Sequence, residues 1–174
     1  MVGTLSVSEV AAVEHQRERR GESGALRWLA EAGFRDAPSV AGLIGETPLA
    51  KLTRFSEGLL PSVRVYGKVE GLNPGGSIKD RAGLFIVYDG LKSGRLESSK
   101  TLIDATSGNT GIAYAMMGAA LGFSVQLAMP ADVTPERVQI LRAYGADLIL
   151  TDPAKATDGA RRLVSRMVAE HPER

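Results

Sequence analysis

A lysine near the start of a predicted helix is the residue in this sequence best placed for chemistry. The segment 73–81 reads NPGGSIKDR, so Lys79 follows a glycine-rich loop. Apolar residues continue at helical spacing, and Ser77 with Asp80 predicts a capping-box-like start, which puts Lys79 at about the second helical position. The positive end of a helix disfavours an ammonium ion, and burial would act in the same direction. The neutral amine so favoured could attack an aldehyde to form a Schiff base.

A second glycine loop occurs at residues 106–111, which read TSGNTG. Residues 101–105 before it predict a short buried strand, and residues 112–121 after it predict a tightly packed helix. Gly108 and Gly111 would let backbone N–H groups converge at the helix N-terminus, where anions bind. Neither a P-loop nor the full dinucleotide fingerprint is present, and an ordinary strand-to-helix turn uses the same residue types.

Together, the two motifs resemble those of the cysteine synthase branch of the fold-type II pyridoxal-phosphate enzymes. The resemblance runs from about Val40 to about His171 and includes residues 43–49, LIGETPL, which are similar to a motif near the start of cysteine synthases. It implies that Lys79 carries pyridoxal 5'-phosphate and that Asn109 hydrogen-bonds the phenolic oxygen of this cofactor. It also implies a loop that holds the substrate carboxylate. The residues of that loop are Thr106, Ser107, Gly108, Asn109 and Thr110.

The activity implied by the resemblance is β-replacement on an O-activated serine, either O-acetylserine or O-phosphoserine. Lys79 would remove the α-proton as general base, the leaving group would depart to give an aminoacrylate, and sulfide would add to give L-cysteine. Cystathionine synthesis and β-replacement with another nucleophile stay open as alternatives. A different class also stays open, namely a non-catalytic fragment or assembly module. A visible cofactor band that shifts with an activated serine would separate an enzyme from such a module.

The resemblance covers only the N-terminal half of the family. Cysteine synthases carry a second half with a glycine- and threonine-rich loop for the cofactor phosphate and a serine that meets the pyridine nitrogen. In this sequence the only glycine after Gly145 is Gly159, which lies within a predicted helix. We therefore expect a fragment, a split subunit or part of a longer enzyme, completed by a C-terminal half in cis or in trans.

The sequence divides into two zones: one precedes these motifs and the other contains them. Residues 1–39 predict a helical N-terminal extension, with one helix through about Arg20 and a shorter one from Ala25 to Ala32. Residues 40–174 predict an α/β domain that binds cofactor and substrate. Short apolar segments alternate there with helical patterns, which indicates a parallel sheet with helices on both faces. Ligands of such sheets bind beyond the carboxyl ends of the strands.

Several element ends follow from local signals in the α/β domain. Residues 63–70, 124–129 and 147–151 predict further strands. Thr134 and Pro135 predict the N-cap and first residue of a helix that ends before Gly145. Thr157 predicts the N-cap of a final amphipathic helix that runs to about Glu170.

Composition limits the partners. The 21 basic and 20 acidic residues nearly balance, so nothing indicates binding to nucleic acid or to an anionic membrane surface. No apolar run is long enough to span a bilayer, and the N-terminus lacks a signal peptide core. Without cysteine there is no disulfide or thiolate metal site, which predicts a cytoplasmic protein. We also expect a homodimer, solvated His15 and His171 with no metal, and a structural role for Lys68.

Overall fold

The computed structural model describes residues 40–97 and 99–173. The chain divides into two compact units, residues 1–38 and residues 39–174, and the described residues belong to the second. The predicted helices of the N-terminal extension, together with His15, lie outside the described residues.

A parallel sheet of three strands forms the centre of this unit. Its strands are β3 (Thr101–Ala105), β4 (Ser124–Pro130) and β5 (Asp147–Thr151), in the order β3-β4-β5, and both pairings are parallel. The central strand β4 buries Val125 and the run from Leu127 to Met129. A strand covered on both faces is expected to carry such a nearly continuous apolar run. The predicted parallel sheet is confirmed.

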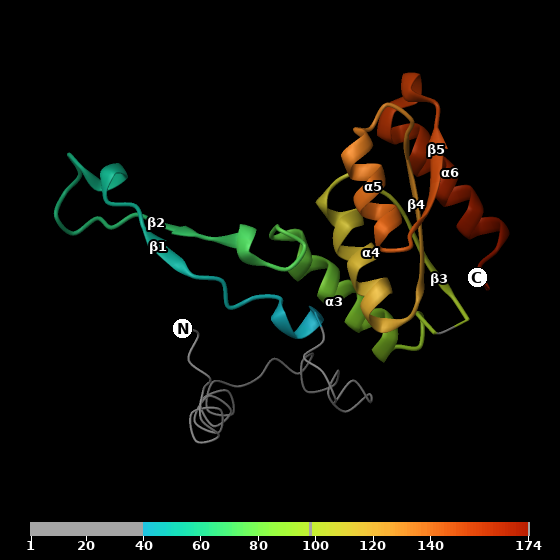
Figure 1. Cartoon of the computed structure of the whole chain (residues 1–174), viewed down its shortest axis with the longest axis horizontal. Helices are drawn as coiled ribbons and strands as arrows, with labels where there is room; N and C mark the ends of the chain where they lie inside the picture. The colour runs from blue at the N-terminus through green and yellow to red at the C-terminus, as the bar shows by residue number, and fades with distance from the viewer. Residues whose placement is uncertain (1–39, 98, 174) are drawn as a thin grey trace, which may run out of the picture. The chain divides into compact units, whose positions relative to one another are not determined.

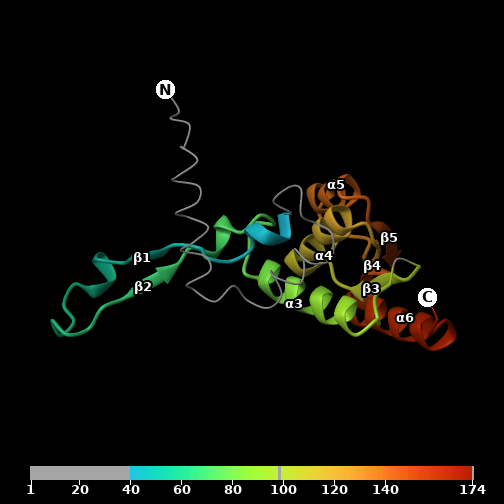
Figure 2. The same ribbon diagram turned by 90° about the horizontal axis from the view of Figure 1, so that it is seen from below.

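Helices cover both faces of this sheet, as Figures 1 and 2 show. Helix α6 (Ala156–Glu170) packs against β3 and β4, whereas α4 (Asn109–Leu121) packs against β4 from the other face and also contacts α5 (Pro135–Ala143). Helix α3 (Lys79–Lys92) packs directly on α4. The order of layers is therefore α6, then the sheet, then α4 with α5, and α3 on α4.

The backbones of α3 and α4 approach each other closely at a glycine. A Cβ atom added to Gly83 would lie 2.7 Å from Met117 Cε and 3.0 Å from Ala113 Cβ, so a larger residue would force the helices apart. Both helices run in the same general direction (Figure 1). This contact therefore sets the first turns of α3 and α4 at the same end of the helix pair.

A short antiparallel hairpin precedes α3. It pairs β1 (Leu49–Lys51) with β2 (Tyr66–Lys68), and Leu49 lies opposite Lys68. The strand predicted at residues 63–70 is thus shorter than expected, because only its three central residues have a strand partner. Three short 3-10 helices, η1 (Val40–Leu43), η2 (Arg54–Ser56) and η3 (Glu70–Leu72), complete this part of the chain.

The predicted ends of α5 agree with the structure, whereas the predicted starts of α4 and α6 do not. Thr134 is the N-cap of α5, Pro135 is its first residue, and Gly145 follows the helix with a φ of 81°. The N-cap predicted at Thr157 is wrong, because α6 already begins at Ala156 after the turn η4 (Pro153–Lys155). Helix α4 starts at Asn109, three residues before the predicted 112. None of the helices in the described ranges is long and apolar enough to cross a membrane.

Candidate active site

The first turn of α3 is built differently from the predicted capping box. The N-cap residue is Ile78, it makes no side-chain cap, and Lys79 is the first helical residue rather than the second. Ser77 Oγ instead accepts the backbone N–H of Lys79 at 3.1 Å. The serine therefore binds the backbone of the lysine. The conformation of the glycine loop before Ser77 must be set by other contacts.

Asp80 fixes the glycine loop that leads into α3. Its side chain is completely buried, and its Oδ2 atom accepts the backbone N–H of Gly75 at 2.6 Å. A Cβ atom at Gly75 would lie 2.4 Å from Asp80 Oδ1, so this loop position requires glycine. Burial raises the pKa of Asp80, while hydrogen bonds from the Gly75 and Ser77 backbone act in the opposite direction.

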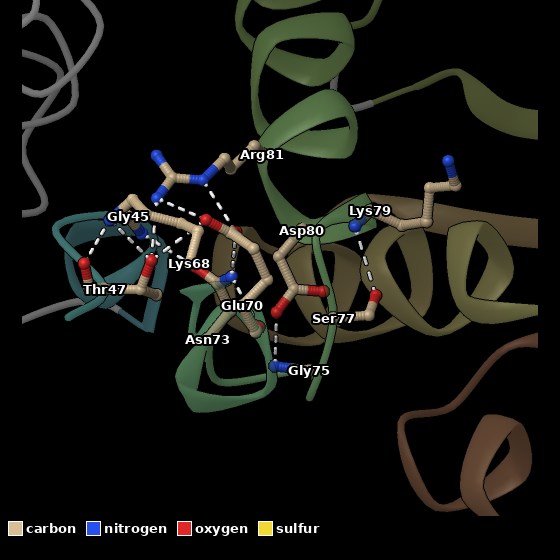
Figure 3. Close-up of polar contacts among 10 residues, drawn as sticks. All are labelled: Gly45, Thr47, Lys68, Glu70, Asn73, Gly75, Ser77, Lys79, Asp80 and Arg81. Carbon is tan, nitrogen blue, oxygen red and sulfur yellow. Dashed lines mark hydrogen bonds and ion pairs between the residues drawn. The ribbon is translucent and has the colours of Figure 1, made fainter. Parts of the chain in front are cut away.

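The side chain of Lys79 extends away from these contacts (Figure 3). It is exposed, so burial does not act on this amine in the described residues. Within the described ranges, no hydrogen bond or ion pair involves its Nζ atom. The backbone of this residue is thus held firmly while its amine is accessible to a ligand.

The second glycine loop opens α4 without a protein cap. Gly108 is the N-cap in an extended conformation, no side chain caps the helix, and its first turn holds no acidic residue. The first N–H groups of a helix have no partner within it, so they can bind an anion here. A Cβ atom at Gly108 would meet nothing within 4 Å, which shows open space at this end of the helix.

Gly111 also has a packing role that the sequence did not predict. A Cβ atom there would lie 3.1 Å from Leu127 Cδ1 and 3.2 Å from Thr106 Cγ2. The glycine therefore lets α4 lie close against β4. This close approach fixes the start of α4 relative to the carboxyl end of the sheet.

A basic side chain that sequence reasoning missed also contacts this loop. Arg137 Nη1, from the first turn of α5, donates to the backbone carbonyl of Ser107 at 3.0 Å. The N-terminal ends of helices in a parallel α/β unit share one edge of the sheet. That rule could have pointed to the first turn of α5 as a neighbour of the loop.

The close contact between α3 and α4 brings the two sequence motifs to one place. Lys79 lies one helical turn before Gly83, and Asn109 lies one turn before Ala113. Since Gly83 packs on Ala113, the lysine and the glycine loop begin their helices at the same end of the pair. The structure therefore brings the predicted site residues together.

A polar cluster that the sequence did not predict lies beside the first turn of α3 (Figure 3). Arg81 donates from Nε to Glu70 Oε2 at 2.8 Å and from Nη2 to Glu70 Oε1 at 3.0 Å. The Glu70 carboxyl also accepts hydrogen bonds from Thr47 Oγ1 and Asn73 Nδ2. The hydrogen bonds from Arg81 are the main cause that lowers the pKa of Glu70 to about 2, so Glu70 is ionised at neutral pH.

Lys68 belongs to the same cluster. Its Nζ atom donates to Thr47 Oγ1 at 2.8 Å and to the Thr47 carbonyl. These contacts support the predicted structural role of Lys68.

Among the described residues, no group of three or more potential metal ligands is arranged to hold a metal. The side chain of His171 is exposed, and its Nδ1 atom lies 3.5 Å from Glu173 Oε1.

Comparison with known proteins identifies the family. Residues 40–174 match the model of the family described as "Pyridoxal-phosphate dependent enzyme". The chain belongs to this family. The resemblance inferred from the two motifs is thereby confirmed, as is the cofactor class of the family.

Curated relatives are named as cysteine synthases. A cysteine synthase of Aquifex aeolicus is 49% identical over 156 residues, which are 86% of this chain and 47% of that protein. Cysteine synthase B of Escherichia coli is 46% identical over 124 residues, 71% of this chain and 40% of that protein. The chain therefore spans less than half of the length of these relatives.

Solved structures with the same fold carry related names. A cysteine synthase of Entamoeba histolytica superposes with a TM-score of 0.73 at 42% identity, covering 77% of this chain and 40% of that chain. An O-acetylserine-dependent cystathionine β-synthase of Helicobacter pylori gives a TM-score of 0.70 at 34% identity, covering 79% of this chain and 45% of that chain. These likenesses confirm the fold-type II class.

Proposed function

We propose that this chain supplies the lysine-bearing and substrate-binding part of a pyridoxal-phosphate-dependent β-replacement enzyme. The reaction proposed is the conversion of O-acetylserine or O-phosphoserine and sulfide into L-cysteine. The observation that carries the proposal is the pairing of an accessible Lys79 amine with an uncapped glycine loop at the same end of two packed helices. The names of the relatives in both comparisons support the same activity.

Each residue has a defined task in this proposal. Lys79 Nζ would hold the aldehyde carbon of pyridoxal 5'-phosphate and, once released from it, would take the α-proton of the amino acid. The cofactor supplies an electron sink for the charge left on the α-carbon. Asn109 would hydrogen-bond the phenolic oxygen of the cofactor. The substrate carboxylate would lie at the start of α4, held by Thr106, Ser107, Gly108, Asn109 and Thr110.

The donor set of the described residues fits this assignment. The carboxylate of an amino acid needs several donors that point at one place, and the first turn of α4 offers backbone N–H groups without a competing carboxylate. The substrate β-carbon would lose the acetate or phosphate group and gain the sulfur, while Lys79 carries the proton. The fixed backbone of Lys79 would keep its amine within reach of the α-carbon.

Cystathionine synthesis is the second candidate. The specific observation in its favour is the likeness to the cystathionine β-synthase of Helicobacter pylori. The name of another solved structure, an O-ureido-L-serine synthase with a TM-score of 0.69 at 35% identity, supports keeping β-replacement with another nucleophile open. Product analysis with sulfide, homocysteine or another small nucleophile supplied separately would distinguish these activities.

The proposed enzyme needs a counterpart to residues 40–174. The relatives are more than twice as long as the matched segment, and the region around the hairpin exposes Phe55 at 74% and Leu60 at 72%. Such exposed apolar side chains are typical of a surface that another segment covers. We propose residues 1–39 as a helical N-terminal extension and residues 40–174 as the domain that binds cofactor and substrate. A homodimer and a cytoplasmic location stay predictions.

Reductive trapping tests the proposal. The purified chain is mixed with excess pyridoxal phosphate, reduced with borohydride and mapped by mass spectrometry. We expect label on Lys79, loss of this label in Lys79→Ala, and no loss in the matched control Lys51→Ala, because Lys51 is an exposed lysine of β1. Label on Lys68 instead, or none on Lys79, would overturn the assignment.

A further inference from the structure

The polar cluster beside α3 joins parts of the chain that are distant in sequence. Glu70 and Arg81 form its centre through two parallel hydrogen bonds, at 2.8 and 3.0 Å. Thr47 Oγ1 donates to Glu70 at 2.9 Å and accepts from Arg81 Nη2 at 3.1 Å. The strand lysine Lys68 also donates to Thr47. The segment before β1, the strand β2, the turn η3 and the helix α3 are therefore held by one network.

This network grips the lysine loop at both ends. At its start, Asn73 donates to Glu70 Oε2 at 2.8 Å and accepts the backbone N–H of Gly45 at 2.9 Å. At its end, Arg81 lies two residues after Lys79 and binds the same carboxylate. Between these points Asp80 holds the backbone of Gly75. The loop is thus anchored before, within and after its glycines.

The cluster is sheltered enough for its charges to act strongly. Asn73 is 3% exposed and Thr47 is 6% exposed, while the side chains of Glu70 and Arg81 are 17% and 35% exposed. Partly buried pairs are screened less than surface pairs, and a planar guanidinium fixes geometry through its two parallel bonds. An exposed pair at the C-terminal end of α3 offers a comparison: Asp89 of this helix with Arg95, which follows it, and both side chains are mostly exposed.

We propose that Glu70 and Arg81 are positioning residues for Lys79, which hold the first turn of α3 so that the lysine amine meets its aldehyde partner in a fixed geometry. The inference rests on the proposed function, in which Lys79 is the reacting amine. Neither side chain touches the Lys79 amine in the structure, so their action passes through the backbone of the loop and helix. Bond formation tolerates little misplacement of a reacting group, so a looser loop should slow it.

The test compares aldehyde trapping at two lysines of the 174-residue chain. Each variant receives excess pyridoxal phosphate and borohydride well below its melting temperature, and the label on Lys79 is divided by that on Lys51. In Glu70→Gln, which replaces the ionised acceptor with a neutral amide, we expect this ratio to fall about tenfold. The milder variant Arg81→Lys keeps the charge but loses the two-pronged geometry, so we expect a smaller fall. The matched control Asp89→Asn should keep the wild-type ratio.

The outcomes separate this inference from the proposed function. If the wild-type chain does not label Lys79 in preference to Lys51, the proposed function fails. If the wild type does so and folded Glu70→Gln and Arg81→Lys keep the wild-type ratio, the positioning role is overturned even where melting temperatures fall. If Glu70→Gln does not fold, Arg81→Lys decides alone. A lowered ratio in both variants, with Asp89→Asn unchanged, supports the positioning role.

Discussion

The hairpin region (residues 40–78) and the α/β region (residues 79–173) are stabilised in different ways. Among the described residues, the buried apolar side chains of the hairpin region are Ala41 and Ile44, whereas those of the α/β region extend over the helices and the sheet. The hairpin region exposes more large apolar residues than the α/β region does, and the Glu70–Arg81 cluster ties it to α3. The α/β region has a core of its own, whereas the hairpin region depends mainly on polar contacts.

Lys79 lies at the border between the hairpin region and the α/β region. The glycine loop at residues 106–110 lies wholly within the α/β region, where packing around Gly111 fixes it. The lysine loop belongs to the hairpin region, and its conformation depends on the polar cluster. Changes in either region should therefore affect different steps, namely substrate binding on one side and the reaction of the amine on the other.

The largest effect on cofactor binding and activity should come from adding a C-terminal segment that covers the hairpin region. We expect the 174-residue chain alone to fold and bind pyridoxal phosphate weakly, without forming cysteine. Adding a C-terminal segment equivalent to the unmatched half of the relatives should restore the visible band and β-replacement, since the cofactor phosphate needs several aligned donors. Absorbance spectra and mass-spectrometric detection of cysteine would measure both. Robust cysteine formation by the purified chain, free of longer species, would contradict this expectation.

Core substitutions should show the second difference between the regions. Leu127→Ala in β4 removes a completely buried side chain, which should lower the free energy of unfolding by about 2–5 kcal/mol. The matched change Leu60→Ala removes a side chain that is 72% exposed and should cost under about 0.5 kcal/mol. Urea denaturation would measure both values. Similar losses for the two variants would mean that the hairpin region has a core of its own after all.

The sequence predicted the α/β region well because its elements are defined by local signals. Strand β3 matches its predicted range of residues 101–105, and the Thr134–Pro135 start and Gly145 end of α5 were correct. The hairpin region was predicted less well, because the strand at 63–70 depends on a partner only three residues long. The Glu70–Arg81 cluster was missed, since its members are distant in sequence and no local period connects them.

Substitutions in the loop of the α/β region should weaken substrate binding. Ser107→Ala or Thr110→Ala removes a donor at the start of α4, and a hydrogen bond to a charged group is worth about 1.5–3 kcal/mol, or about one to two decades in affinity. Asn109→Ala should instead disturb the cofactor band. Titration with an amino-acid substrate in the protein completed by its C-terminal segment measures these effects, with Ser93→Ala at the end of α3 as control. Unchanged titrations in all three variants would make the loop a simple turn.

The smallest effect concerns pH and compares two carboxyl groups beside Lys79. Hydrogen bonds from Arg81 lower the pKa of Glu70 from 4.5 to about 2 in the folded chain. The unfolded chain therefore binds more protons between these values, so the stability contributed by Glu70 is present above about pH 4.5 and is lost as the pH falls toward 2. Glu70→Gln should accordingly lose less stability than the wild type on acidification.

Asp80 should show the opposite sign. Burial raises its pKa above 3.8, so the folded chain holds this proton more tightly, and the stability linked to it is lost as the pH rises through the folded pKa. Asp80→Asn should remove this loss. In that variant the stability should therefore fall more steeply on acidification, because only the Glu70 effect is left. Melting temperature against pH for both variants tests the pair. Parallel curves for Glu70→Gln, Asp80→Asn and wild type would mean that neither carboxyl couples its ionisation to the fold. The Glu70–Arg81 cluster would then hold the hairpin region through hydrogen-bond geometry rather than charge.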